Sequence, residues 1–292
     1  MYIRRLFVIL IWFVAMFSAS KTQAQGFYTD FGKNRVQYHD FIWSYYESSN
    51  FMTYFYQGGQ DLAKFTVQYA EQSIGKIESR LEYPANTKIE IMLYHNLSDL
   101  KQSNIGLGVE QNNTGGVTKI IGNKIFIHFD GNFKNLERKI REGIARVLVQ
   151  KMVFGSTIQE ILQNAVLLNL PDWYVNGLVA YIGRDWDTEL DNRLRRGMLN
   201  NEFARFDLLT GENATFAGHA LWYYISQVHG PSAIPNLLYL TRINRSVESG
   251  FLYVLGSPYE VITNGWYSYF HDRYASENAL RQNPVNQDLK VK

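Results

Sequence analysis

The alternation of apolar and polar positions divides the chain into two halves of different character. In the first half, short segments that alternate or run apolar predict strands near residues 51–56, 88–94 and 124–129. Apolar residues at helical spacing over residues 62–81 predict an amphipathic helix lying on that sheet. We therefore expect about four strands and at least one long helix before residue 130.

The second half shows almost only helical periodicity. Its apolar spacing predicts helices near residues 133–154, 156–168, 172–184, 187–200, 213–229, 231–244 and 258–274. The predicted fold class is α+β, with an N-terminal mixed sheet and helices followed by a mainly helical C-terminal half. We divide the chain into a mixed α/β subdomain (25–130), a helical subdomain (131–275) and a polar tail or linker (276–292).

The N-terminal segment has the pattern of a secretory signal peptide. Arg4 and Arg5 precede an apolar run from Leu6 to about Ala19, and a small-residue cleavage site follows at Ala24. The run is shorter than the roughly 20 residues of a membrane-spanning helix. We expect residues 1–24 to be removed, and the protein to be exported to the periplasm, the outer membrane or the cell surface without spanning a membrane.

The composition limits which interactions can stabilise the fold and which partners the protein can bind. The 292 residues include no cysteine, which excludes disulfides and a lipid-modified cysteine, so packing must stabilise the fold. Removing the signal peptide leaves 26 basic residues against 27 acidic ones, from 29 and 27 in the whole chain. This balance lacks the basic excess that binding to nucleic-acid phosphates requires.

Two segments have the form of a zinc site whose ligands are replaced. Zinc peptidases use H-E-x-x-H on one helix, because histidines four residues apart face the same metal, and a glutamate on a later helix as third ligand. Residues 142–148 resemble H-E-x-x-H-V-L, but Glu142 and Arg146 stand at the two histidines and Gly143 at the catalytic glutamate. Residues 170–181 resemble L-P-x-W-x-x-E-G-x-A-x-Y, with Asn176 in place of the third ligand.

These segments resemble the thermolysin-like gluzincins, and residues 218–230 resemble the helix-to-glycine element that follows the third ligand in that family. Segments 31–38, 102–106 and 168–173 are similar to exported Bacteroidota proteins in which a degenerate peptidase module precedes a TolB-like β-propeller. The sequence contains no propeller repeat. The resemblance implies a gluzincin-like fold without its zinc site, as a component of a cell-envelope assembly.

The replaced positions suggest how the former metal site is filled. Glu142 precedes Arg146 by four residues, the favourable orientation for a helical ion pair. Our hypothesis is that this pair occupies the metal position and that Asn176 donates a further hydrogen bond to it. An ordinary surface ion pair is the alternative. Asp172, Trp173, Tyr181 and His219 are the candidates for lining the cleft.

The predicted function is non-catalytic: a pseudopeptidase that binds a protein or peptide partner, with no metal or cofactor. One alternative is an active metallopeptidase with unconventional ligands. A second is a carbohydrate-binding module on aromatic residues near the first strand, although core packing is the favoured interpretation of that cluster. Its members are Trp43, Tyr45, Tyr46, Tyr54, Phe55 and Tyr56.

An acidic run at residues 185–191 resembles the start of a calcium-binding loop. Leu190 stands where such a loop has its glycine, and Arg196 where it has its last acidic ligand. We therefore expect this run to form the N-terminus of a helix, where carboxylates stabilise the free backbone N–H groups.

Overall fold

The computed structural model of the chain describes residues 37, 40–103, 119–155, 160, 164, 168 and 170–280. The predicted signal peptide and most of the predicted helix at 156–168 lie outside these residues. The described residues belong to one unit that begins at Gln37.

A five-stranded mixed sheet forms the N-terminal side, in the order β1-β2-β3-β5-β4. Its three inner strands, β2 (Phe51–Phe55), β3 (Ile89–Tyr94) and β5 (Lys124–His128), run parallel. The short strands β1 (Ser44–Glu47) and β4 (Lys119–Ile121) pair antiparallel at the two edges. The inner strands confirm the three predicted segments, whereas the edge strands are too short for periodicity to define their ends.

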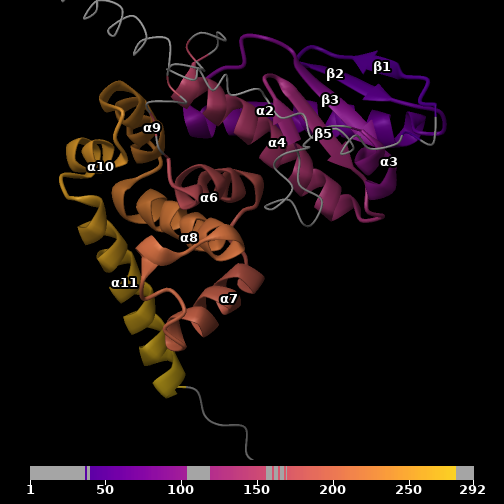
Figure 1. Ribbon diagram of the computed structural model, residues 1–292. Helices are drawn as coiled ribbons and strands as arrows, with labels where there is room; N and C mark the ends of the chain where they lie inside the picture. The colour runs from indigo at the N-terminus through magenta and orange to yellow at the C-terminus, as the bar shows by residue number, and fades with distance from the viewer. Residues whose placement is uncertain are drawn as a thin grey trace, which may run out of the picture. The chain divides into compact units, whose positions relative to one another are not determined.

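The two faces of the sheet are covered differently. On one face, fully buried Phe51, Ile91 and Ile125 belong to a core cluster that also includes buried residues of α2 (Gln60–Leu81) and α4 (Phe133–Phe154). On the other face, a smaller cluster buries Tyr56, Tyr94, Phe126 and Leu100, the last from the short helix α3 (Leu97–Gln102). In Figure 1, α2 and α4 lie beside the inner strands of the sheet.

The second half is helical, as predicted. It comprises α6 (Asp172–Gly183), α7 (Thr188–Leu199), the 3₁₀ turn η2 (Phe206–Leu208), α8 (Gly211–His229), α9 (Ala233–Asn244), α10 (Val247–Leu255) and α11 (Tyr259–Leu280). Asp187 caps α7 by accepting a hydrogen bond from the Leu190 amide, which confirms the helix N-terminus predicted at the acidic run. Helix α10 was not predicted, because its nine residues are too few to show a period.

The predicted tail begins too early. Helix α11 continues to Leu280, so residues 276–280 are helical. Glu277 explains the extension: its carboxylate accepts a hydrogen bond from Arg273 one turn earlier, at 3.0 Å, and another from Arg195 of α7, at 2.5 Å. These contacts hold the last turns of α11 against α7 although the segment is polar.

Helix α4 connects the two halves. More than one of its faces is covered, because the following residues are all fully buried: Leu136, Ile140, Ile144, Val149 and Val153. One hydrophobic core extends from the sheet through α4 to α11, across the proposed subdomain boundary at residue 130. No helix in the described ranges is both long and apolar enough to cross a membrane.

Candidate functional site

Two of the positions that the resemblance aligns with zinc ligands, Arg146 and Asn176, come together between α4 and α6. The Arg146 guanidinium donates a hydrogen bond from Nη1 to Oδ1 of Asn176, at 2.8 Å. The two residues are therefore neighbours in space, as expected. The predicted direction of the hydrogen bond is wrong: a guanidinium has five N–H donors and no acceptor, so Asn176 must accept.

Glu142 and Arg146 do not form the expected direct ion pair. The cation closest to the Glu142 carboxylate is Arg138, one turn earlier in α4, with Nε 3.8 Å from Oε1. Arg146 turns instead to Asn176, because the amide of α6 offers a well-placed acceptor. A guanidinium–amide contact between two helices thus joins two of the positions that the resemblance aligns with zinc ligands, with the Glu142 carboxylate on the same helix as Arg146.

Burial controls the electrostatics of this group. The Glu142 side chain retains 30% of its exposure, yet desolvation raises the pKa of its carboxyl, and the charges of Arg138, Arg146 and Arg141 oppose that shift. Burial also lowers the pKa of the Arg146 guanidinium, which Glu142 opposes. Arg146 nevertheless stays positively charged, because the reference pKa of arginine is far above neutral pH.

Close packing of α4 against α6 fixes the position of Glu142. Gly183, the last residue of α6, lies against the Glu142 side chain, and a methyl group added at Gly183 would collide with the Glu142 Cγ. Arg141 strengthens the same contact by donating from Nε to the Gly183 carbonyl, at 2.7 Å. Gly143, which the resemblance aligns with the catalytic glutamate, is buried in α4.

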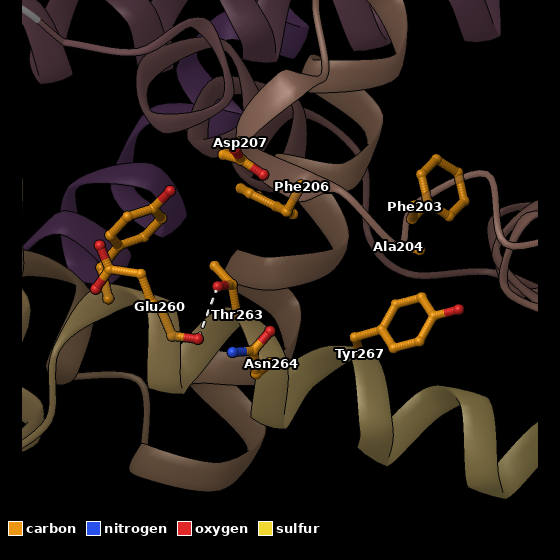
Figure 2. Close-up of a pocket in the computed structure, with 9 residues that line it drawn as sticks. Phe203, Ala204, Phe206, Asp207, Glu260, Thr263, Asn264 and Tyr267 are labelled. Atoms are coloured by element: carbon orange, nitrogen blue, oxygen red, sulfur yellow. Dashed lines mark hydrogen bonds between the residues drawn. The ribbon is translucent and has the colours of Figure 1, made fainter.

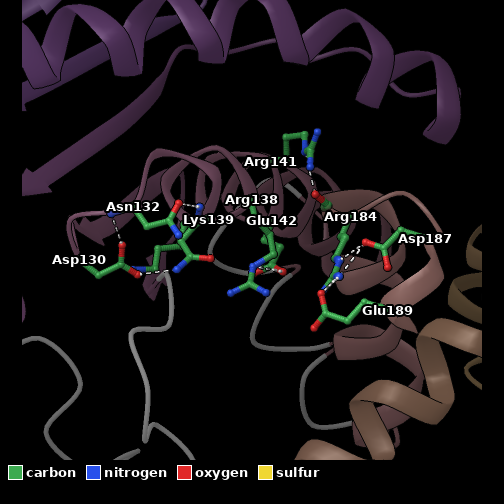
Figure 3. A network of polar contacts seen from close by, with 11 residues as sticks. Asp130, Asn132, Arg138, Lys139, Arg141, Glu142, Arg184, Asp187 and Glu189 are labelled. Atoms are coloured by element: carbon green, nitrogen blue, oxygen red, sulfur yellow. Dashed lines mark hydrogen bonds and ion pairs between the residues drawn. The ribbon is translucent and has the colours of Figure 1, made fainter. Parts of the chain in front are cut away.

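A line of polar contacts continues from this site in both directions (Figure 3). Toward the start of α4, the buried Lys139 donates to the His128 carbonyl at 3.1 Å and to Asp130 at 3.2 Å. Toward α7, Arg184 contacts Asp187 at 2.7 Å and Glu189 at 2.6 Å. The site therefore lies within a charged layer that borders α4 and α6.

The face of α6 toward α8 is apolar and tightly packed. A methyl group added at Gly177 would lie 2.6 Å from the Gly218 backbone, and one added at Gly218 would collide with the Trp173 carbonyl oxygen. Trp222 of α8 donates its indole N–H to the Tyr174 carbonyl, at 3.0 Å. The two backbones therefore approach each other closely, which only glycine permits at these positions.

The structure does not bring the four candidates for lining the cleft together at one place. Trp173 is 5% exposed and packs among the rings of Phe206, Trp222 and Tyr259. Asp172 is exposed in the first turn of α6. Trp173 lines a cavity of about 320 Å³ that includes Pro171 and Arg245, and none of the four replaced positions lines it.

Tyr181 and His219 do contact each other. Their rings meet edge to face with centroids 6.0 Å apart, and the Trp186 ring lies 5.5 Å from His219 on another side. His219 is 3% exposed, and among the residues that the structure describes its Nε2 has no hydrogen-bond partner. Burial lowers the pKa of His219 to about 4, and the Arg184 charge acts in the same direction, so the ring is neutral at pH 7.

The aromatic cluster near the first strand is mostly used in packing. Trp43 packs against Tyr56 and Tyr94 with centroids 5.3 and 5.4 Å apart, and Tyr46 stacks on Phe55 at 4.8 Å. Tyr45 differs, because it is 52% exposed although it pairs with Tyr54 across the strands. Packing explains most of this cluster and leaves Tyr45 at the surface.

Sequence reasoning missed two residues of the site. Arg138 is the closest cation to Glu142, and its position four residues before Glu142 is a signal that the sequence contains. Gly183 was not singled out, because its role depends on how α6 crosses α4. Within the described ranges, no three residues among His, Cys, Asp and Glu are grouped closely enough to hold a metal ion.

Comparison of the chain with protein-family models and with curated proteins gives no match.

Proposed function

We propose that this protein is a non-catalytic, metallopeptidase-like module that binds a protein or peptide partner in the cell envelope. The observation that carries the proposal is the hydrogen bond from Arg146 to Asn176, at 2.8 Å. It joins the two helices at the positions where the resemblance to gluzincins would put one histidine ligand and the glutamate ligand.

The chemistry of these residues supports a binding role. A permanently charged guanidinium at this position repels a divalent cation, and its N–H groups cannot act as metal ligands. The same donors suit carboxylate and carbonyl acceptors, which every peptide presents. Gly143 supplies no side chain that would activate water, so a peptide held along α4 would be bound without being cleaved.

Restoring the ligands tests whether these positions correspond to a zinc site. In a triple variant with Glu142→His, Arg146→His and Asn176→Glu, we expect about one zinc per chain after dialysis, measured by elemental analysis. The wild-type protein and the single variant Arg146→His are the matched controls, and both should stay substoichiometric. Zinc at one per chain in the wild-type protein, with peptide cleavage that stops on chelation, would identify an active metallopeptidase instead.

Photocrosslinking in the cell envelope tests the binding role. A photoreactive amino acid at Asp172 or Tyr181 probes the two ends of α6, and one at Tyr239 of α9, which is 61% exposed, is the control position. We expect one defined protein or peptide adduct from an α6 position and none from Tyr239. No defined adduct from either α6 position, or the same adducts from all three, would contradict the proposal.

A further inference from the structure

A second concave site lies between the 3₁₀ turn η2 and helix α11. Phe203, Ala204, Phe206 and Asp207 form one wall, and the first turns of α11 form the other, around a cavity of about 330 Å³ (Figure 2). This volume lies at the lower end of the range of small-ligand sites. The site shares no residue with the Arg146–Asn176 contact.

Aromatic rings give the pocket rigid walls. Phe206 packs against Trp173 and Trp266 with centroids 5.3 and 5.4 Å apart, and Tyr259 stacks on Trp173 at 6.0 Å. The Tyr267 hydroxyl donates to Oδ1 of Asn201, at 2.8 Å, which holds this ring at the opposite end of the pocket. The cavity is therefore formed by rings that the core already holds in place.

The lining also contains two carboxylates and no cation. Asp207 and Glu260 both line the cavity, and among the described residues neither carboxylate has an ion-pair or hydrogen-bond partner. Both lie near the Tyr259 hydroxyl: burial raises the pKa of Tyr259, and the charges of Glu260 and Asp207 raise it further. The pocket thus combines negative charge with aromatic surface.

We propose that this pocket binds an organic cation, namely the ammonium or guanidinium group of a lysine or arginine side chain on a basic peptide. Ring faces attract cations, and a carboxylate adds a charge-assisted hydrogen bond from each N–H group. An anion would meet two carboxylates without compensation. A purely apolar ligand would gain no interaction with Asp207 and Glu260, which are exposed residues.

The competing explanation is structural. Glu260 lies in the first turn of α11, and Asp207 in that of the 3₁₀ turn η2. Carboxylates stabilise helix N-termini without any ligand. This explanation predicts that the two residues affect stability alone, whereas the proposal predicts that they determine the affinity for a cation. The two explanations are separable by measuring binding and melting on the same variants.

The test is a titration of the purified protein followed by backbone amide NMR. The probes are N-acetyl-lysine methylamide and N-acetyl-arginine methylamide, with the uncharged N-acetyl-norleucine methylamide as control. We expect the basic probes to shift amides in residues 203–207 and 259–267, with a Kd of about 1 mM. The norleucine probe should leave these amides in place.

Substitutions of exposed residues then show whether Asp207 and Glu260 are responsible for binding the basic probes. The double variant Asp207→Asn and Glu260→Gln should weaken binding of the basic probes about tenfold. Asp272→Asn, on the same helix and 80% exposed, is the matched control and should change it less than about twofold. Equal shifts from norleucine, unchanged affinity in the double variant, or no shift in these segments would each overturn the proposal. None of these outcomes bears on the Arg146–Asn176 site.

Discussion

Helix α6 presents two unlike faces to its neighbours. Toward α8, Gly177 and Gly218 bring the backbones into close contact, and aromatic rings fill the space beside them. Toward α4, the contact is polar: Arg146 donates to Asn176, and Arg141 donates to the Gly183 carbonyl. The α8 face permits almost no change in side-chain volume at its glycines. The α4 face is held by hydrogen bonds from two arginines, with close packing at Gly183 against Glu142.

The difference shows where substitutions can accumulate on this helix. Trp173 and Gly177, which carry the resemblance to gluzincins, belong to the packed face, where each contacts α8 through its backbone or its ring. Asn176, which departs from the gluzincin pattern, lies on the face toward α4. A polar contact can change its chemistry while the packed face keeps the helix in place, because fold and site depend on different residues.

The packed face should give the largest effect when it is disturbed. Gly218→Ala adds a methyl group that collides with the Trp173 carbonyl oxygen, and this oxygen cannot move unless α6 moves. We expect the free energy of unfolding to fall by about 3 kcal/mol in chemical denaturation. Gly75→Ala is the matched control, because the space around this helical glycine is open; it should raise stability by about 0.5 kcal/mol. Equal effects of the two substitutions would show that the α6–α8 contact is loose.

Most of the fold could be predicted from sequence, because long elements repeat their pattern several times. The 22 residues of α2 and of α4 show several helical periods. The three residues of β4 and the nine of α10 do not, so tertiary contacts determine their limits. The end of α11 was misplaced for a related reason: Glu277 is polar, and its partner Arg195 is 82 residues away in the sequence.

Three members of the candidate site, Glu142, Arg146 and Asn176, could be predicted from the sequence, but the contacts between them could not. The spacing of Glu142 and Arg146 and the motif around Asn176 brought the right residues together. The direction of the Asn176 hydrogen bond follows from the chemistry of a guanidinium alone. Arg138 and Arg146 are both four residues from Glu142, so the spacing alone does not show which of them Glu142 contacts. The hydrogen bond to Asn176 of α6 orients the Arg146 side chain away from Glu142, which leaves Arg138 as its closest cation.

The pH dependence of stability that His219 causes shows whether water is excluded from the packed face of α6 at its end near α7. Its pKa is about 4 in the folded protein against 6.5 for an unperturbed histidine. Below pH 6.5 the unfolded chain therefore binds a proton that the folded protein excludes until about pH 4. This histidine should make the protein lose about 2 kcal/mol of stability between about pH 7 and pH 4.5.

Denaturation of wild type and His219→Phe at both pH values measures this contribution. Aspartates and glutamates also titrate in this interval, so the quantity to compare is the difference between the two proteins. The variant should lose less stability on acidification, by the amount that belongs to His219. Parallel losses in both proteins would mean that water reaches the ring.

Arg146 should have the next largest effect, on the polar face. Arg146→Ala leaves Oδ1 of Asn176 without its donor and removes one of the charges that favour ionised Glu142. We expect a loss of about 1.5 kcal/mol in the free energy of unfolding. This is less than for a fully buried ion pair, because Glu142 keeps Arg138 and is 30% exposed. An unchanged melting temperature would show that the contact with Asn176 is solvated.

Arg138 should have the smallest effect, although it is the cation closest to Glu142. Its ion pair spans 3.8 Å between side chains that are 39% and 30% exposed, so water screens most of the attraction. Arg138→Ala should cost about 0.5 kcal/mol, and about 0.5 M sodium chloride should remove this difference from wild type. The Arg146→Ala effect should persist in the same salt, because it comes mainly from a hydrogen bond between two helices. If Arg138→Ala is the more damaging substitution, the carboxylate and not the Arg146–Asn176 contact holds α4 against α6.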